Sequence, residues 1–291
     1  MLMRLVILSL LALSGQASAQ QPQPSPFSTT LVEGTQNVYV FRYQNHQSMF
    51  VVTPAGVIAT DPISYGRPQA ATTYVEEIRK VTKAPIKFLI YSHHHDDHIA
   101  GGKPFKDAGA VIVAHRRARE RLAARRNADV LLPDQAVGDK HTLQLGGTIL
   151  ELHHVGRNHS DSSLVMFLPK EKIIFAVDFN SIGVPPRLTI NDSYPVEWET
   201  SLKRTLALKW ERQIPGHPGP GGRLGTRKDM EDLLTFMTTM SAEVKKASDS
   251  GKCFSPADTE LKLPGFATMP GYEQNLSWNV HRWCGYWGRG I

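Results

Sequence analysis

Short apolar runs separated by turn residues set the pattern of the first third of the chain. Such runs, rich in β-branched and aromatic residues, are typical of strands. They occur at Val38–Phe41, Met49–Thr53, Gly56–Thr60, Ile86–Tyr91 and Ala110–Ala114. Arg67–Thr82 instead has apolar positions at helical spacing, which predicts a helix. Ile99–Asp107 and the basic run His115–Arg126 are also expected to be helices.

The second half of the chain repeats this alternation. Strands are expected at Thr142–Leu145, Thr148–His154, Ser163–Leu168 and Lys172–Val177, and helices at Val196–Leu208 and Arg227–Lys246. Two similar blocks of strands and helices predict an α/β fold, with two sheets packed face to face and helices outside. The tail, Ser250–Ile291, is rich in Gly, Pro and Trp. We expect it to wrap irregularly over the core rather than to form a second domain.

The first nineteen residues have the pattern of a signal peptide. Arg4 supplies positive charge, Leu5–Leu13 is apolar, and Ala17–Ala19 is a small-residue cleavage site. The apolar stretch is short for a membrane span, although an uncleaved anchor is the alternative. We therefore expect a periplasmic or secreted protein that begins at Gln20, with no stable membrane insertion. The predicted division is a linker at 20–28, one main domain at 29–248 and an extension at 249–291 packed on that domain.

The formal net charge of +6 is concentrated in the basic helix, His115–Arg126. This helix could meet an anionic partner, or it could be a solvated face that keeps the protein soluble. No aromatic residue interleaves its arginines to stack on bases, so we favour the solvated face and expect no nucleic acid partner. The two cysteines, Cys253 and Cys284, are expected to form a disulfide in an oxidising compartment; two buried free thiols are the alternative.

The candidate chemistry is concentrated in one run, Tyr91–Gly102 (YSHHHDDHIAGG). It contains the pattern H-x-H-x-D-H, formed by His93, His95, Asp97 and His98. Imidazole and carboxylate are the groups that hold zinc and similar divalent metals. A solvated His-rich loop is the alternative. His94 and Asp96 alternate with these residues and are expected to point away from a metal.

Three further candidate ligands follow predicted strands, where placement is rigid. They are His159, Asp178 and His217. Each alone could be an ordinary loop or capping residue. Together with the dense motif they make seven candidate ligands, which is too many for one tetrahedral zinc and suits two.

These marks give the sequence a resemblance to the metallo-β-lactamase fold superfamily over roughly Asn37–Pro220. The resemblance implies an αββα sandwich of two mixed β-sheets with a site for two Zn²⁺, or alternatively Fe or Mn. By position, His93, His95 and His159 would hold the first metal and Asp97, His98 and His217 the second. Asp178 would bridge the two metals, and Asp61 would orient a ligand histidine.

Lactamases that hydrolyse antibiotics typically carry Cys or Ser where this chain has Asp178. Aspartate there resembles glyoxalase II-type thioesterases, lactonases and phosphodiesterases. We therefore expect a zinc-dependent hydrolase whose metal-bridging hydroxide attacks an ester, lactone, thioester, amide or phosphoester. Asp97 is also a candidate proton acceptor. A β-lactamase, an iron-dependent sulfur oxygenase and a non-catalytic metal-binding protein are the alternatives.

The substrate is expected to be a small, partly apolar molecule; the oligomeric state is not predicted. Candidate contacts come from the long segment after Asp178 and from the C-terminal tryptophans. They are Ile182, Arg187, Tyr194, Trp198, Trp278, Trp283 and Trp287. The alternative is that these side chains only cover the core.

Overall fold

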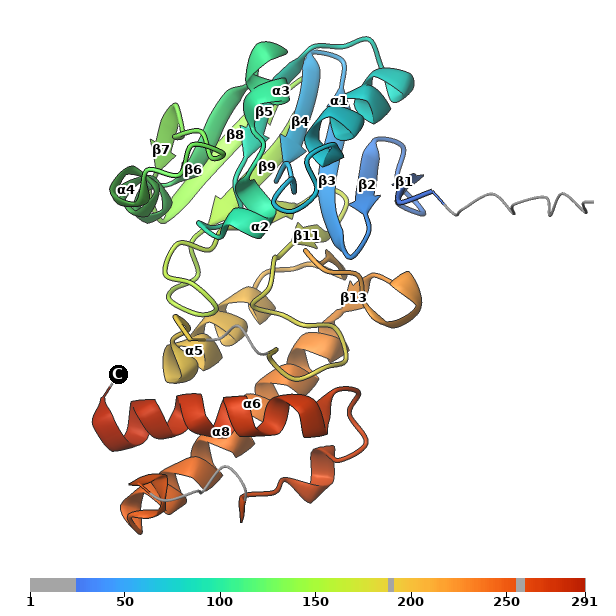
Figure 1. Cartoon of the computed structure of the whole chain (residues 1–291). Coiled ribbons are helices and arrows are strands. Elements are labelled where there is room, and N and C mark those ends of the chain that lie inside the picture. The colour runs from blue at the N-terminus through green and yellow to red at the C-terminus, as the bar shows by residue number, and fades with distance from the viewer. Residues whose placement is uncertain (1–24, 188–190, 255–259, 291) are drawn as a thin grey trace, which may run out of the picture.

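Two mixed β-sheets form the centre of the protein in the computed structural model, which describes residues 25–187, 191–254 and 260–290 (Figure 1). The first sheet has seven strands, ordered β1 to β7 across its width. Strands β1 to β4 pair antiparallel, and β4 to β7 pair parallel. The strands are β1 (Phe27–Leu31), β2 (Val38–Tyr43), β3 (His46–Thr53), β4 (Gly56–Thr60), β5 (Ile86–Ile90), β6 (Val111–His115) and β7 (Gln135–Val137).

The second sheet has six strands in the order β13-β12-β11-β10-β9-β8. Strands β11 and β12 pair parallel, and the other neighbouring strands of this sheet pair antiparallel. The strands are β8 (Lys140–Leu145), β9 (Thr148–His153), β10 (Val165–Leu168), β11 (Ile173–Phe175), β12 (Arg212–Ile214) and β13 (Gly225–Thr226). The α/β class with two mixed sheets is therefore confirmed.

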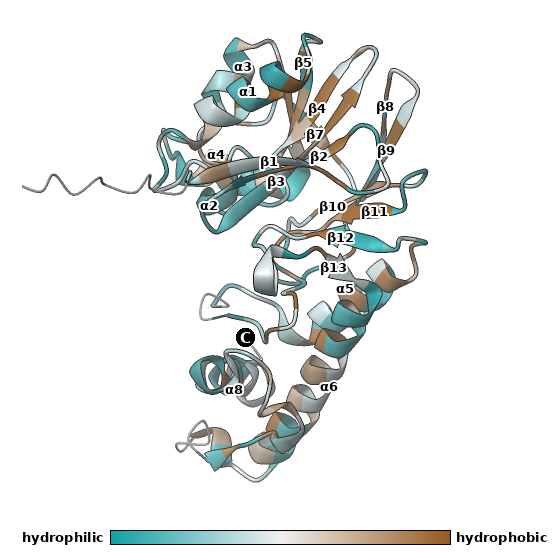
Figure 2. Cartoon of the chain, turned by 90° about the vertical axis from the view of Figure 1, so that its right-hand side faces the viewer, coloured by the Kyte–Doolittle hydropathy of each residue, from teal (hydrophilic) through white to brown (hydrophobic). Residues whose placement is uncertain are grey.

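Helices lie against the outer faces of both sheets (Figures 1 and 2). On the first sheet they are α1 (Ala70–Val81), α3 (Lys103–Asp107) and α4 (Arg116–Arg125), with α2 (Asp96–Ile99) at the edge. On the second they are α5 (Pro195–Leu206) and α6 (Arg227–Asp249), and α8 (Tyr272–Arg289) packs on α6. Short 3₁₀ turns lie at Pro220–Gly222, Lys252–Phe254 and Pro264–Phe266.

Strand alternation divides the core into three apolar layers. In β5, Leu89 packs toward α1 and α3, whereas Ile90 packs between the sheets. In β10, Met166 packs between the sheets and Phe167 toward α5 and α6. Successive side chains of a strand point to opposite faces, so a strand that is covered on both sides must be apolar throughout. This requirement explains the continuous apolar runs in the sequence.

The parallel strand pairs determine at which edge of the sheets the polar loops lie. The carboxyl ends of β4 and β5 lie at the same edge of the first sheet, and those of β11 and β12 lie together in the second. Asp61 follows β4 directly and His93 follows β5 after two residues. Asp178 and His217 each come three residues after the ends of β11 and β12. The fold therefore brings candidate ligand residues from both sheets to one edge.

Most predicted elements are confirmed, with shifts of a few residues at their ends. The sequence pattern did not predict β7, β12 and β13, which are only two or three residues long. The predicted linker at 20–28 is wrong at its end, because β1 begins at Phe27 and pairs with β2. Isolated runs this short carry too little periodicity to be recognised.

The single helix predicted over Ile99–Asp107 is also wrong. The segment belongs to two short helices, α2 and α3, interrupted at Ala100–Gly102. Gly101 has a φ of +90°, which an L side chain adopts only with strain, and it packs against Ser64. This residue turns the chain between the two helices, and Asp97 and His98 lie on α2 rather than on a plain loop.

The tail does not wrap irregularly as predicted, since it ends in the 18-residue helix α8. Its buried face packs on α6 and contributes Tyr272, Leu276, Val280 and Trp283 to the apolar layer beneath the second sheet. These residues follow helical spacing. Abundant glycine in the tail hid that spacing, although Gly271 and Gly290 lie at the helix ends. These contacts join α8 to the same apolar layer as α5 and α6.

Cys253 and Cys284 form the disulfide that the sequence predicted, and it joins the turn after α6 to α8. Within the described ranges, no helix has the length and apolar content to cross a bilayer. Residues 1–19, the predicted signal peptide, lie outside the described residues.

Replacement of Cys253 by Ser should lower the free energy of unfolding by about 3 to 4 kcal/mol, since the bond closes a loop of 31 residues. Denaturant unfolding under oxidising conditions measures this loss. Cys284→Ser should lower the free energy of unfolding by the same amount. The double variant should lose no more stability than either single variant. Equal stability of Cys253→Ser and wild-type protein would contradict the prediction.

Candidate metal centre

Four loops at the common edge of the two sheets carry the seven predicted ligands. The loop after β5 and the first turn of α2 supply four of them, and His159 comes from the loop between β9 and β10. Asp178 and His217 come from the loops after β11 and β12. The structure brings all seven together in two groups of potential ligand atoms, within which no two atoms are more than 4.8 Å apart.

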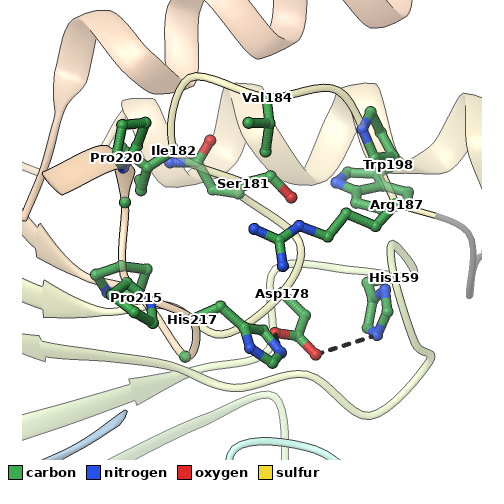
Figure 3. Close-up of a pocket in the computed structure, with 15 residues that line it drawn as sticks. His159, Asp178, Ser181, Ile182, Val184, Arg187, Trp198, Pro215, His217 and Pro220 are labelled. Atoms are coloured by element: carbon green, nitrogen blue, oxygen red, sulfur yellow. Dashed lines mark ion pairs between the residues drawn. The ribbon is translucent and has the colours of Figure 1, made fainter. Parts of the chain in front are cut away.

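The first group consists of His93, His95, His159 and Asp178. His95 Nδ1 lies 3.0 Å from His159 Nε2, which in turn lies 3.4 Å from Asp178 Oδ2 (Figure 3). His93 Nε2 lies 3.7 Å from the same carboxylate oxygen. Three imidazole nitrogens and one carboxylate therefore face a common point, as the resemblance implied.

The second group contains Asp97, His98 and His217, together with His46. Asp97 Oδ2 is 3.4 Å from His98 Nε2 and 4.0 Å from His217 Nε2. Asp178 reaches this group as well, at 3.1 Å from His98 Nε2 and 3.4 Å from His217 Nε2. Asp178 thus lies between the two groups, where a bridging ligand would lie.

These separations match the requirements of metal coordination. Four ligands at about 2.0 to 2.1 Å from a zinc ion lie about 3.3 Å from one another in a tetrahedron. Three buried atoms that face the groups have no hydrogen-bond partner among the described residues: His93 Nε2, His98 Nε2 and Asp178 Oδ1. Buried polar atoms are rarely left unpaired, so a cation is the partner that this donor set fits.

Burial keeps most of these imidazoles neutral, which is the form that binds metals. Burial lowers the pKa of His159 to about 4 and lowers the pKa of His93 well below its usual 6.5. His98 differs. Burial alone would lower its pKa, but the carboxylates of Asp178, Asp97 and Asp61 outweigh this and raise the pKa of His98 to about 9.

The second ring nitrogens of the histidines are held by partners outside the two groups. Ser92 Oγ lies 2.9 Å from His93 Nδ1, and His217 Nδ1 donates to the Asn45 carbonyl at 2.8 Å. His95 Nε2 donates to Asp192 Oδ2 at 2.7 Å. Such partners fix the tautomer, so that the other nitrogen presents its lone pair to a metal. Asp192 was not identified from the sequence, because nothing local marks it as a partner of His95.

Asp61 lies where the resemblance placed it. Its Oδ1 accepts from the Ser92 backbone N–H at 2.8 Å, and Oδ2 lies 3.9 Å from His98 Nδ1. Burial raises the pKa of Asp61 to about 6.

The backbone is strained at two acidic residues of the site. Asp61 and Asp178 have φ values of +27° and +63°, in the region that favours glycine. Strained backbone at two acidic residues of one site is typical of functional positions.

Gly216 allows the two sheets' loops to meet closely. A Cβ atom there would lie 2.5 Å from Val177 Cγ1 and 2.8 Å from His98 Cε1. Any larger residue would displace His98 or the loop that carries His217. The glycine before His217 is therefore required by packing against the candidate metal centre.

His94 and Asp96 lie outside both groups, as expected. His94 Nδ1 lies 2.8 Å from Ser162 Oγ, and Asp96 accepts from Arg125 and Asn127. The basic helix α4 is less solvated than expected, because Arg121 forms two hydrogen bonds to Asp161, two residues after His159. These ion pairs tie the helix to the loops that carry the candidate ligands.

A pocket of about 210 Å³ opens beside the candidate metal centre (Figure 3). His159, Asp178 and His217 form its floor, and Ile182, Val184 and Trp198 give it apolar walls. The Arg187 guanidinium points toward Asp178 and His217 (Figure 3). A shallower groove, lined by Tyr65, Asp97, Asn191 and Asp192 among others, shares the same three floor residues.

The predicted substrate contacts divide into two sets. Ile182, Arg187 and Trp198 line the pocket. The others do not: Tyr194 lies under Arg157, Trp283 is buried in the core, and Trp278 is half exposed on α8. Trp287 lies beside Lys245 of α6. These four are therefore wrong as pocket residues. The three tryptophans lie on α8, because the tail forms a helix on α6 instead of reaching the site, and Tyr194 precedes α5.

Comparison with known proteins agrees with this geometry. The sequence model of the metallo-beta-lactamase superfamily matches residues 46–217, more than half of the chain. The chain belongs to the metallo-β-lactamase superfamily. This confirms the resemblance at the level of the family.

Individual relatives are distant. The 2,4-dinitroanisole O-demethylase subunit alpha of Nocardioides sp. (strain JS1661) is 26% identical over 208 residues, which cover 70% of this chain and 61% of that protein. A metallo-beta-lactamase type 2 of Bacillus cereus is 27% identical over 155 residues, covering 51% of this chain and 58% of that protein. The chain thus spans about six tenths of the length of these relatives.

Solved structures share the fold at lower identity. A metallo-beta-lactamase from Pontibacter korlensis superposes with a TM-score of 0.62 at 19% identity, over 73% of this chain and 99% of that one. The DIM-1 metallo-beta-lactamase superposes with a TM-score of 0.63 at 21% identity, over 74% of this chain and 98% of that one. These matches support the fold of this superfamily member.

Metal affinity should rise with pH, because a bound metal must displace the proton of His98. Its pKa of about 9 means that the imidazole is protonated at neutral pH in the metal-free protein. Affinity for the second Zn²⁺ should increase by up to about tenfold per pH unit above pH 7 and flatten as the pH passes the pKa of His98. Competition with a chelating dye measures this. The same affinity at pH 7 and pH 9 would contradict the prediction.

Proposed function

We propose that this protein is an exported, dinuclear zinc-dependent hydrolase of small molecules. The observation that carries the proposal is the position of Asp178, within 3.7 Å of imidazole nitrogens from both ligand groups. A shared carboxylate between two such groups suits two divalent ions. Ions held there would lower the pKa of a water molecule to about 7 and polarise a carbonyl or phosphoryl oxygen.

The reaction also needs a group that accepts a proton. Asp97 is the candidate proton acceptor, because its side chain is well exposed among the ligands and its carboxylate lines the open groove. Partial burial raises the pKa of Asp97, but the neighbouring His46 and the charge of His98 outweigh it and hold that pKa well below its usual value, so that Asp97 is ionised at neutral pH. Proton transfer by a positioned carboxylate contributes about 10²- to 10⁴-fold to a rate.

The pocket favours a substrate with an apolar part and an electron-rich or anionic group. Ile182, Val184 and Trp198 can bury the apolar part, and Arg187 can pair with the polar group. A substrate that extended from the pocket into the groove would lie across Asp178, which lines both. Carboxylic esters and lactones fit this arrangement best among the bonds considered.

The alternatives differ in metal and substrate. Asp178 in place of the Cys or Ser typical of antibiotic-hydrolysing lactamases weighs against β-lactams. The two ligand groups favour two metals over a single iron, which weighs against a sulfur oxygenase. The relative named as a 2,4-dinitroanisole O-demethylase supports aryl methyl ethers as a second candidate substrate class.

Export rests on the sequence of residues 1–19 and on the disulfide, because disulfides persist in oxidising compartments. Cell fractionation with N-terminal mass analysis tests this. Protein found in the cytoplasm with residues 1–19 intact would contradict export.

The function is tested with a substrate panel and metal analysis of the same preparation. We expect two Zn²⁺ per chain and hydrolysis of esters or lactones, with β-lactams and 2,4-dinitroanisole as comparison arms. Matched esters that differ by one carboxylate test the role of Arg187, since Arg187→Ala should raise KM only for the anionic one. No turnover of any substrate by protein with two metals would overturn the proposal.

Asp97→Asn should lower kcat by about 100-fold, because the amide cannot accept a proton. The variant is assayed at saturating Zn²⁺ with metal content measured. Asp96→Asn is the matched control, since Asp96 bonds to Arg125 and Asn127 outside the ligand groups. Full activity of a fully metallated Asp97→Asn protein would exclude the proton-acceptor role.

A further inference from the structure

His46 lies in the second ligand group, although no sequence motif marks it. It is the first residue of β3, at the tip of the hairpin between β2 and β3. Only 5% of its surface is exposed to solvent. Its Nε2 lies 3.1 Å from Asp97 Oδ2, a shorter distance than that from His98 or His217 to the same oxygen. It belongs with Asp97, His98 and His217 in a set whose ligand atoms all lie within 4.8 Å of one another.

The hydrogen bonds of His46 direct a lone pair toward this group. Its Nδ1 lies 3.0 Å from Asn45 Oδ1, an amide oxygen that can only accept. In the tautomer that donates to Asn45, Nδ1 carries the proton of the neutral ring and Nε2 faces Asp97 Oδ2 with a lone pair. Two acceptor atoms 3.1 Å apart repel each other unless a positive charge lies between or beside them.

The ring orientations are compatible with shared coordination. The His46 ring is inclined by 66° to that of His217 and by 49° to that of His98, with centroids 4.2 and 5.1 Å apart. Inclined rings can aim their in-plane lone pairs at one point. His115 and His154 form a useful contrast: their rings stack at 6° and 4.2 Å, so both lone pairs cannot point at a single ion, although Asp139 lies nearby.

The backbone holds His46 in place relative to His217. The Gln47 N–H donates to the Gly216 carbonyl at 2.8 Å, and His217 Nδ1 donates to the Asn45 carbonyl at 2.8 Å. Two reciprocal bonds thus join the hairpin tip to the loop after β12. Ligands placed by such a braced pair of loops need little rearrangement when an ion binds.

We propose that His46 is a direct ligand of the second metal ion, together with Asp97, His98, His217 and the shared Asp178. The inference rests on the proposed dinuclear function. It gives the protein six imidazole ligands, namely His93, His95 and His159 for the first ion and His46, His98 and His217 for the second. The second ion would then have five protein ligands, which leaves less room for water there than at the first ion.

The test uses the full mature protein with ¹⁵N-labelled histidine, stripped of metal and loaded with ¹¹³Cd²⁺ as the probe. Direct coupling between ¹¹³Cd and a ring nitrogen identifies each bonded imidazole in the wild-type protein. We expect six coupled histidines, with His46 coupled through Nε2. Five coupled histidines with His46 uncoupled would overturn the proposal without any need for a variant.

Substitutions provide an independent measurement. His46→Ala should weaken binding of the second Cd²⁺ by at least about tenfold and move only that ion's resonance. His46→Gln should also move the resonance, because an amide cannot replace the ring nitrogen. His153→Ala, which removes another buried imidazole outside both groups, should leave both resonances in place.

A residue that only positions Asp97 gives a different result. Both Cd²⁺ resonances of His46→Gln would then stay at their wild-type shifts, and this would overturn the proposal. Failure of the proposed function is separable, since it would appear as an inactive zinc protein in which His46 is nevertheless coupled to the metal. Conversely, an active zinc enzyme with His46 uncoupled would refute only the inference.

Discussion

A buried carboxylate surrounded by imidazoles is the constraint on which the rest of this structure depends. Asp178 lies within 3.7 Å of ring nitrogens from His93, His98, His159 and His217. Such a concentration of polar atoms is costly in an apolar core unless each one is paired. Two divalent ions would pair nearly all of them at once. The loops, the strained backbone at Asp61 and Asp178, and the close approach at Gly216 are all consistent with that requirement.

The two sheets supply the rigidity that such a centre needs. Parallel pairs in both sheets bring their carboxyl ends to one edge, so ligands from distant parts of the chain start from fixed strand ends. The outer layers add further restraint. Helix α4 is tied by Arg121 to Asp161 beside His159, and α8 covers α6 beneath the second sheet. The side of the centre away from the core stays open as a pocket and a groove.

Much of this arrangement could be predicted because it depends on local signals. The H-x-H-x-D-H motif places four ligand types within six residues, and His159, Asp178 and His217 each follow an apolar strand. The two predicted sheets are present, the seven predicted ligand residues lie in two close groups, and Asp61 lies near His98. The same signals failed for α8, where glycines obscured the helical spacing, and for strands of only two or three residues.

His46 and Asp192 could not have been found in this way. Each lies far along the chain from its partner, 51 residues from Asp97 and 97 residues from His95, and nothing around them repeats a known pattern. The sequence alone determined the alternation of elements, the apolar layers and the dense ligand motif, because burial and metal binding constrain residue type locally. Only the tertiary structure decided which polar residues complete the centre, since hairpin tips and loops meet there through packing that no local pattern encodes.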